Sequence, residues 1–523
     1  MINKKTKGII AAGHPITAKA GKIILEAGGN AYDAVAGAFF AACLAEPSLA
    51  SLGGGSYLMA RNKDGESFLY DFFVQTPKRK KKSSEMDFYP VEVDFGGATQ
   101  VFHIGMASSA VPGSAKGIFE IQKELGIMPI KKVIEPAVKF AREGIVMNWF
   151  SGFAFEILSE IYKSQPETLK IFESHQKEGE LLLEGEILKN EELANVLEFL
   201  AKKGVDEFYQ GEIAIKMTQD MKNKGGLITL DDLKNYQIKK RKPLIIDYRD
   251  AEFITNPPPS AGGILISVAL KLLEKIDLKN IKYGSEKHLL ALILAMKETG
   301  IIRKNKIDDN IREKDVIKKV LNDHFLDKSF ENISRRVNKW GSTTQISVID
   351  KDGNIASMTT TNGEGSGYLI PGTGSVLNNM LGEEDLNPKG FFEWQENERV
   401  SSMMAPSIVV DDKLKIAVGS AGSNRLRSAI LQTIISILDF NKDIEKAVNN
   451  PRLHFENEKL DIEAGFSNEV VKKIKREFPK ANIWKDKNLF FGGANCVMFD
   501  EKKREFSGAG DIRRQGVCLL AEG

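Results

Sequence analysis

Residues 341–354, GSTTQISVIDKDGN, indicate where the sheet that organises this fold begins. Ile346 and Val348 alternate with polar residues, which is the pattern of a β-strand. The pair Asp352-Gly353 then predicts a tight hairpin turn. Residues 355–361, IASMTTT, supply the returning strand. The stretch therefore predicts an antiparallel hairpin whose first strand begins close to two threonines.

The length of this turn decides which residues of the two strands lie opposite each other. A two-residue turn would place Thr344 opposite Thr361 and Thr343 opposite Asn362. A β-bulge would shift this pairing by one residue. We therefore expect Thr361 and Asn362 beside Thr343, with Asn362 as a candidate substrate-binding residue.

A second hairpin is predicted in the C-terminal part of the chain. Residues 408–410 and 414–418 are apolar strands around a polar turn, with Asp411 expected to pair with Leu414. The loop GSAGS at 419–423 then leads into an apolar helix, at about residues 426–438. Backbone N–H groups at such a helix start lack partners and suit an oxyanion. On local chemistry alone, such a loop is more often a simple helix cap.

The overall composition excludes several classes of function. The chain has 523 residues, of which 42% are hydrophobic, and its 73 basic and 71 acidic residues give a net charge of +2. This balance provides no basic surface for nucleic acid or an anionic membrane. The N-terminus lacks the apolar segment of a secretory signal, and the apolar run at 34–45 is too short to span a bilayer. We expect a cytoplasmic protein.

Neither the cysteines nor the histidines indicate a metal or redox site. The three cysteines are too few for a disulfide framework, and Cys43 lies in an apolar run that predicts a buried structural thiol. The six histidines show no ligand spacing. The glycine run at 53–55 is not followed by the Lys-Ser/Thr of a phosphate loop. We therefore expect no metal and no cofactor.

Helical segments are expected mainly in the first half of the chain. Thr17 is placed to cap a helix that ends at Gly28-Gly29, and residues 115–225 are predicted to be mostly helical. The stretch 301–337 is rich in Lys, Asp and Asn and is expected to be an exposed region, either helical or loosely ordered.

Motifs in order over nearly the whole chain support a family resemblance. The pattern TTQxSVxDxDGN at 343–354 resembles the processing-site signature of the gamma-glutamyltranspeptidase family. The resemblance continues through GGNAxDA (28–34), Glu46-Pro47, GGG (53–55), VPG (111–113), 230–236, PPPSxGG (257–263), GxGxxLNN (372–379), PSIVV (406–410), GSxG (419–422), NPR (450–452) and GAxDxR (508–513).

This resemblance implies an α+β fold, the four-layer αββα sandwich of the N-terminal-nucleophile hydrolases. It also implies a precursor that cuts itself between Ser342 and Thr343. Residues 1–342 would then form a large subunit and residues 343–523 a small one. The two chains would remain together as an intertwined heterodimer.

The same resemblance assigns catalytic roles. Thr343 is expected to attack the substrate amide, with its freed α-amine as the base. Thr361 would hydrogen-bond and orient Thr343. The backbone N–H groups of Gly422 and Ser423 would form the oxyanion hole, with Ser423 in the place of the family's second glycine.

The expected substrate-binding residues depart from the family pattern. Typical members carry an arginine where this chain has Phe73, and a glutamine and an aspartate where it has Met380 and Glu383. The family's serine pair corresponds either to Ser402 followed by a methionine, or, with one inserted residue, to Ser401 and Ser402. Phe73 and Met380 suggest a more apolar acyl pocket, and Glu383 could accept a hydrogen bond from an ammonium group.

The expected function is hydrolysis or transfer of gamma-glutamyl amides such as glutathione, through a gamma-glutamyl-enzyme. One alternative applies the same nucleophile to another acyl amide, as in the cephalosporin-acylase-like members. The other is an uncleaved scaffold without catalysis, which the presence of Thr343, Thr361 and Gly422 disfavours.

Overall fold

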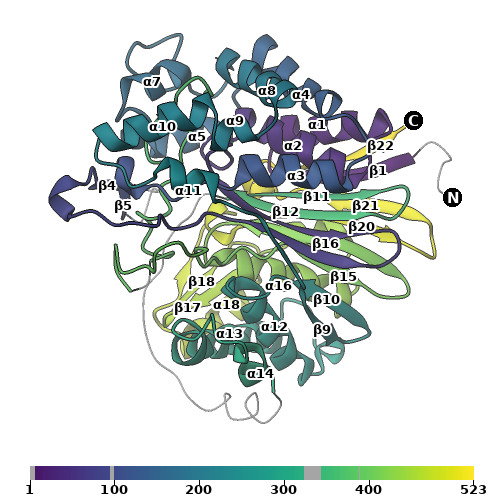
Figure 1. Cartoon of the computed structure of the whole chain (residues 1–523). Coiled ribbons are helices and arrows are strands. Elements are labelled where there is room, and N and C mark those ends of the chain that lie inside the picture. The colour runs from purple at the N-terminus through teal and green to yellow at the C-terminus, as the bar shows by residue number, and fades with distance from the viewer. Residues whose placement is uncertain (1–5, 95–98, 323–342, 388) are drawn as a thin grey trace.

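Two β-sheets lie face to face in the middle of the molecule, and helices cover the outer face of each (Figure 1). The computed structural model describes residues 6–94, 99–322, 343–387 and 389–523. The first sheet has the strand order β22(Val517–Glu522), β1(Thr6–Ala12), β11(Thr344–Asp350), β12(Ile355–Thr361), β2(Gly55–Arg61), β3(Ser67–Phe72), β8(Lys239–Arg241). The second has the order β21(Glu505–Ala509), β20(Gly493–Asp500), β16(Leu414–Ala421), β15(Ser407–Val410), β10(Ala251–Thr255), β9(Leu244–Tyr248).

The helices form the two outer layers. On the first sheet lie α1(Pro15–Glu26), α2(Ala31–Ala45) and α3(Ser114–Leu125), while α4(Ile130–Glu143) packs on α2 and α8(Glu191–Lys203) on α4. On the second sheet lie α12(Ala261–Glu274) and α16(Arg425–Leu438), while α13(Glu286–Ile302) packs on α12 and α18(Asn468–Glu477) on α13. The expected four-layer αββα sandwich is thereby confirmed.

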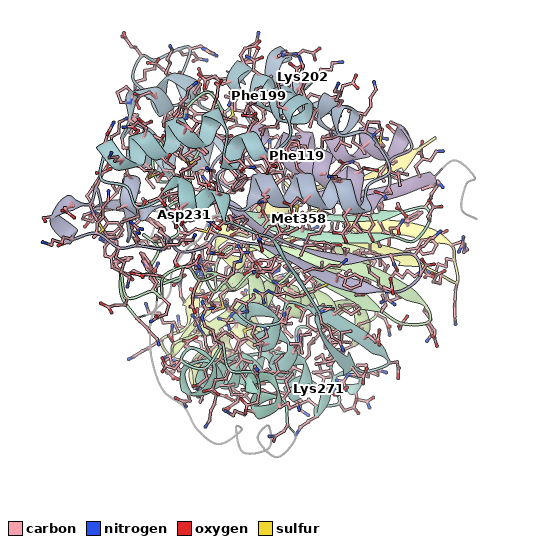
Figure 2. The ribbon with its side chains drawn as sticks, viewed as in Figure 1. Phe119, Phe199, Lys202, Asp231, Lys271 and Met358 are labelled. Carbon is pink, nitrogen blue, oxygen red and sulfur yellow. The ribbon has the colours of Figure 1, made fainter. Side chains whose placement is uncertain are left out.

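Labelled side chains in Figure 2 mark the core and the outer helices. Phe119 on α3 and Met358 on β12 are buried members of the core between the first sheet and its helices. Lys202 on α8 and Lys271 on α12 mark the two outer helical layers. Among the described residues, no helix has the length and apolar character needed to cross a membrane.

The first half of the chain contains most of the expected helices. Residues 115–225 are mostly helical, with α5(Trp149–Ile157), α7(Pro166–Phe172) and α10(Glu212–Asn223) among their helices, and Cys43 is buried. The prediction that Thr17 caps the first helix is wrong. That helix begins at Pro15, a favoured first residue, and the His14 ring nitrogen Nδ1 accepts from the backbone N–H of Ile16.

The predicted hairpin around Asp352-Gly353 is present, but its two-residue turn is not. Thr344 lies opposite Thr360 rather than Thr361. The loop between the paired residues Asp350 and Asn354 holds three residues, and Gly353 takes a φ of 90°. Such a loop with a left-handed third residue is the next commonest hairpin connection. Continued by one position, this register places Thr343 rather than Thr344 opposite Thr361.

The second hairpin follows its predicted register. Ser407 pairs with Val418 and Ile408 with Ala417, as an Asp411–Leu414 pair requires. Strand β16 runs on to Ala421, and α16 begins four residues later at Arg425. The loop 422–424 is therefore held between a central strand and a buried helix.

Candidate active site

Thr343 lies immediately before β11 and is 5% exposed. It lines a cavity of about 40 Å³ together with Thr361, which is 8% exposed. We call this space the Thr343 cavity. Ser342, the other side of the expected cut, lies outside the described residues. The remaining lining residues are Phe73, Glu383, Asp385, Leu386, Ser402, Met403, Met404, Ser423 and Leu426.

Ser423, in the loop between β16 and α16, lines this cavity, and the backbone of the loop has positive φ angles. Gly422 has a φ of 110° and Ser423 a φ of 47°, in the left-handed region that favours glycine. The carbonyl groups of both accept hydrogen bonds from the first turn of α16. The Ser423 hydroxyl donates to Asp385 Oδ2 at 2.6 Å, which compensates for a non-glycine residue in this conformation. The N–H groups of such a loop, at a helix start, are suited to hold a negative oxygen.

The floor of the cavity is apolar. Phe73 is buried and stacks on Tyr57, with ring centroids 5.3 Å apart. Met403, Met404 and Leu426 add further apolar surface. Ser402 reaches the cavity and accepts from the Met404 backbone N–H at 3.1 Å.

Two side chains with carboxyl groups, Glu383 and Asp385, line the Thr343 cavity. Burial, together with the neighbouring charge of Asp385, raises the pKa of Glu383 to about 8. Among the described residues, no donor hydrogen-bonds the Glu383 carboxyl group, and no lysine or arginine lines this cavity. The described lining of the cavity therefore offers no cationic side chain to a carboxylate.

Three expected substrate contacts lie elsewhere. Asn362 is fully buried and donates through Nδ2 to the Val376 carbonyl at 3.2 Å. Met380 is fully buried in the hydrophobic cluster that also contains Phe73 and Tyr57. Ser401 donates to the Pro259 carbonyl at 2.7 Å and lines a neighbouring cavity. None of the three lines the Thr343 cavity.

The neighbouring cavity measures about 200 Å³ and shares Leu386 with the Thr343 cavity. Its lining includes two ion pairs, Arg312 with Glu398 at 3.0 Å and Lys389 with Asp309 at 3.5 Å.

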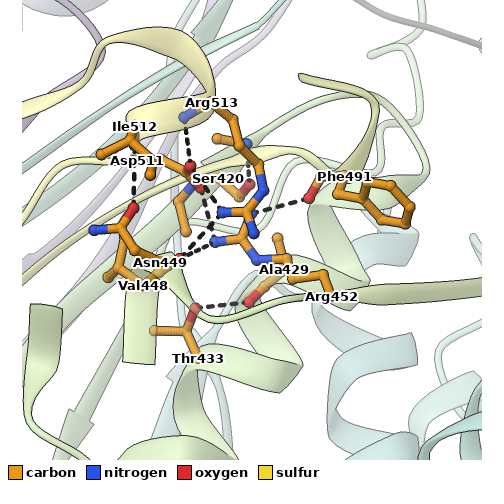
Figure 3. Close-up of polar contacts among 12 residues, drawn as sticks. Ser420, Ala429, Thr433, Val448, Asn449, Arg452, Phe491, Asp511, Ile512 and Arg513 are labelled. Atoms are coloured by element: carbon orange, nitrogen blue, oxygen red, sulfur yellow. Dashed lines mark hydrogen bonds and ion pairs between the residues drawn. The ribbon is translucent and has the colours of Figure 1, made fainter. Parts of the chain in front are cut away.

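Residues that the sequence did not single out complete the site. Asp385 follows the expected Glu383 by two positions in an acidic run, which is the signal that could have identified it. Arg514 donates through Nη1 to the Thr343 carbonyl at 3.4 Å. Figure 3 shows how the turn before Arg514 is held: Asp511 pairs with Arg452 at 2.7 Å and with Arg513 at 3.0 Å.

Comparisons with known proteins agree with this architecture. A family model described as Gamma-glutamyltranspeptidase matches residues 17–521. The Glutathione hydrolase proenzyme of Escherichia coli (strain K12) is 30% identical over 510 residues, covering 91% of this chain and 86% of the relative. The Acylase ACY 1 proenzyme of Pseudomonas sp. (strain SE83) is 29% identical over 537 residues, covering 99% and 94%. The crystal structure of cephalosporin acylase from Bacillus halodurans superimposes with a TM-score of 0.86 at 21% identity, covering 99% of this chain and 96% of that one. At that identity the likeness concerns the fold alone.

Proposed function

The chain belongs to the gamma-glutamyltranspeptidase family of enzymes, and on that premise we propose that it is a self-processing amide hydrolase whose nucleophile is Thr343. The observation that carries the proposal is the position of Thr343, buried at the start of a central strand and lining one cavity with Thr361 and Ser423. Two of the relatives are named as proenzymes, which supports processing of this chain as well.

Processing creates the catalytic base. In the precursor the Thr343 nitrogen is an amide and cannot take a proton. Attack of the Thr343 hydroxyl on the Ser342 carbonyl breaks the peptide bond between them and leaves an ester, which water hydrolyses to a free Ser342 carboxylate. The new α-amine of Thr343 has an ordinary pKa near 8, low enough to accept a proton at neutral pH. Residues 1–342 and 343–523 become two chains of one heterodimer.

The catalytic cycle uses the same hydroxyl. The α-amine takes the proton of Thr343 Oγ as this oxygen attacks the substrate carbonyl carbon. The N–H groups of Gly422 and Ser423 stabilise the negative oxygen of the tetrahedral intermediate. The C–N bond breaks, the amine leaves with the proton, and water or an amine acceptor resolves the acyl-enzyme. Thr361 orients the nucleophile.

The family places gamma-glutamyl amides such as glutathione first among the substrates. The lining of the Thr343 cavity favours a second candidate, an amide whose acyl chain has no carboxylate. A gamma-glutamyl group brings an α-carboxylate and an α-ammonium. Glu383 and Asp385 suit the ammonium, whereas the carboxylate would meet apolar and acidic side chains.

Four chromogenic anilides separate these candidates. They carry the gamma-glutamyl group (carboxylate and ammonium), the glutaryl group (carboxylate only), the 4-aminobutyryl group (ammonium only) and the butyryl group (neither). We expect kcat/KM to be highest for the 4-aminobutyryl anilide and lowest for the glutaryl anilide. A preference for the gamma-glutamyl anilide would return the assignment to glutathione-type substrates. No turnover of any anilide by processed enzyme would contradict the proposed hydrolase.

A further inference from the structure

Thr343 separates two cavities, and the second of them has no part in the proposed catalytic cycle. This second space measures about 10 Å³, close to the volume that one water occupies. Among the described residues, Thr343 alone lines both cavities. The lining residues of the second cavity include Glu46, Thr344, Asn495, Asp511 and Arg514. We call it the Glu46 cavity.

The carboxyl group of Glu46 joins three elements behind the nucleophile. Glu46 follows α2 and is 3% exposed. Its Oε2 accepts from the Thr344 hydroxyl at 2.7 Å, and its Oε1 accepts from the Thr17 hydroxyl of α1 at 2.7 Å. A Cβ at Gly13 would lie 2.5 Å from Thr344 Oγ1 and 2.7 Å from Glu46 Oε2. Glycine at position 13 therefore leaves the space that this contact needs.

Arg514 holds the same peptide from its other side. Its guanidinium donates to the Thr343 carbonyl at 3.4 Å and is 6% exposed. Burial raises the pKa of Glu46, while its hydrogen bonds from Thr344 and Thr17 and the charge of Arg514 act in the opposite direction. The peptide between Thr343 and Thr344 is thus fixed at its carbonyl and at the next side chain.

These contacts of Glu46 and Arg514 gain a role once the precursor has been cut. Once the chain is cut, Thr343 becomes a terminus joined to the protein through one peptide bond. Chain ends are mobile unless contacts hold them. A displacement of about 1 Å at a reacting atom can cost on the order of a hundredfold in rate.

We propose that Glu46 is a positioning residue: through the hydroxyl of Thr344 it fixes the processed terminus so that Thr343 Oγ faces the substrate. This inference rests on the proposed nucleophile. It assigns the buried carboxyl group a role in catalysis beyond its joining of α1, α2 and β11.

The two hydroxyls on the Glu46 carboxyl group provide a matched test. Thr344→Val and Thr17→Val each remove one bond of 2.7 Å to the same carboxyl group, and valine preserves the shape of threonine. If Glu46 acts only as a structural link, both variants should lose similar stability and similar activity. If Glu46 positions the nucleophile, only the bond to Thr344 matters for the rate.

We would measure the melting temperature, the rate of precursor processing by intact mass, and kcat and KM on the best anilide. We expect Thr344→Val to lower kcat of the processed enzyme roughly tenfold or more, to slow processing, and to leave KM within about twofold. Thr17→Val should process and turn over like the wild type, and Thr344→Ser should restore kcat. Equal kcat and equal processing in the two valine variants would overturn the proposal. An uncut or inactive wild-type protein would instead contradict the proposed hydrolase.

Discussion

The hydroxyl of Ser423 donates a 2.6 Å hydrogen bond to Asp385, and so joins the backbone expected to hold the oxyanion to the acidic side of the Thr343 cavity. Ser423 keeps a left-handed backbone conformation with a φ of 47°. The bond ties that conformation to a carboxylate that also lies near the buried guanidinium of Arg425. In the proposed function, this one hydrogen bond therefore connects the residue that binds the acyl group to the residue that stabilises the oxyanion.

This link predicts different effects for two variants. Ser423→Gly relieves the backbone strain while keeping the N–H group, and we expect kcat within about threefold of the wild type.

Asp385→Asn retains an acceptor but removes the charge, and we expect KM for the 4-aminobutyryl anilide to rise roughly tenfold. The butyryl anilide is the control, because it has no ammonium group. An equal loss on both anilides would show that Asp385 does not bind the substrate charge.

The raised pKa of Glu383 predicts a pH dependence of substrate preference. Below about pH 8 the carboxyl group is largely neutral, and above it the group carries a charge that attracts an ammonium. The ratio of kcat/KM for the 4-aminobutyryl anilide to that for the butyryl anilide should rise severalfold between pH 7 and 9. Using this ratio cancels the titration of the Thr343 amine. Glu383→Gln should flatten the profile, and an unchanged slope in that variant would refute the assignment.

The same shift predicts a change in stability. The pKa of the Glu383 carboxyl group is 4.5 in the unfolded chain and about 8 in the folded protein. Its contribution to the stability of the folded state is therefore complete below about pH 4.5. That contribution is lost as the pH rises through about 8. Glu383→Gln should therefore reduce the fall in unfolding free energy between pH 5 and 8. Urea unfolding at several pH values measures this, and parallel profiles for the variant and the wild type would contradict it.

Phe73 stands where the family arginine would bind a carboxylate, so Phe73→Arg should change specificity. The introduced guanidinium would lie against the Thr343 cavity, and we expect kcat/KM for the gamma-glutamyl anilide to rise relative to the 4-aminobutyryl anilide by roughly tenfold. Phe73→Leu is the control for loss of the ring. A ratio that moves equally in both variants would attribute the effect to lost stacking on Tyr57.

The family resemblance predicted the four layers, and the residue pattern predicted both hairpins, but the register of the first hairpin could not be predicted. The Asp350 side chain accepts from the backbone N–H groups of Asp352 and Asn354, which stabilises a three-residue loop. Turn composition does not distinguish this loop from a two-residue one. As a result Thr361, and not Asn362, lines the cavity with Thr343.

The residue pattern of one strand also could not predict that its polar side chains are buried between two sheets. Gln345 and Ser347 alternate with apolar residues, which a half-exposed strand would also show. Both are fully buried, and Ser347 donates to the Asn495 carbonyl of the opposite sheet at 3.0 Å. Asp385 and Met380 likewise lie in an irregular loop, where residue spacing does not predict which way a side chain points.

The self-processing nucleophile is tested most directly by intact-mass measurement of the purified wild-type protein beside Thr343→Ala under denaturing conditions. We expect two wild-type chains, the smaller beginning at Thr343, and a single uncut Thr343→Ala chain. A folded wild-type protein that remains one chain after prolonged incubation, or a Thr343→Ala variant cut at the same bond, would contradict Thr343 as the nucleophile.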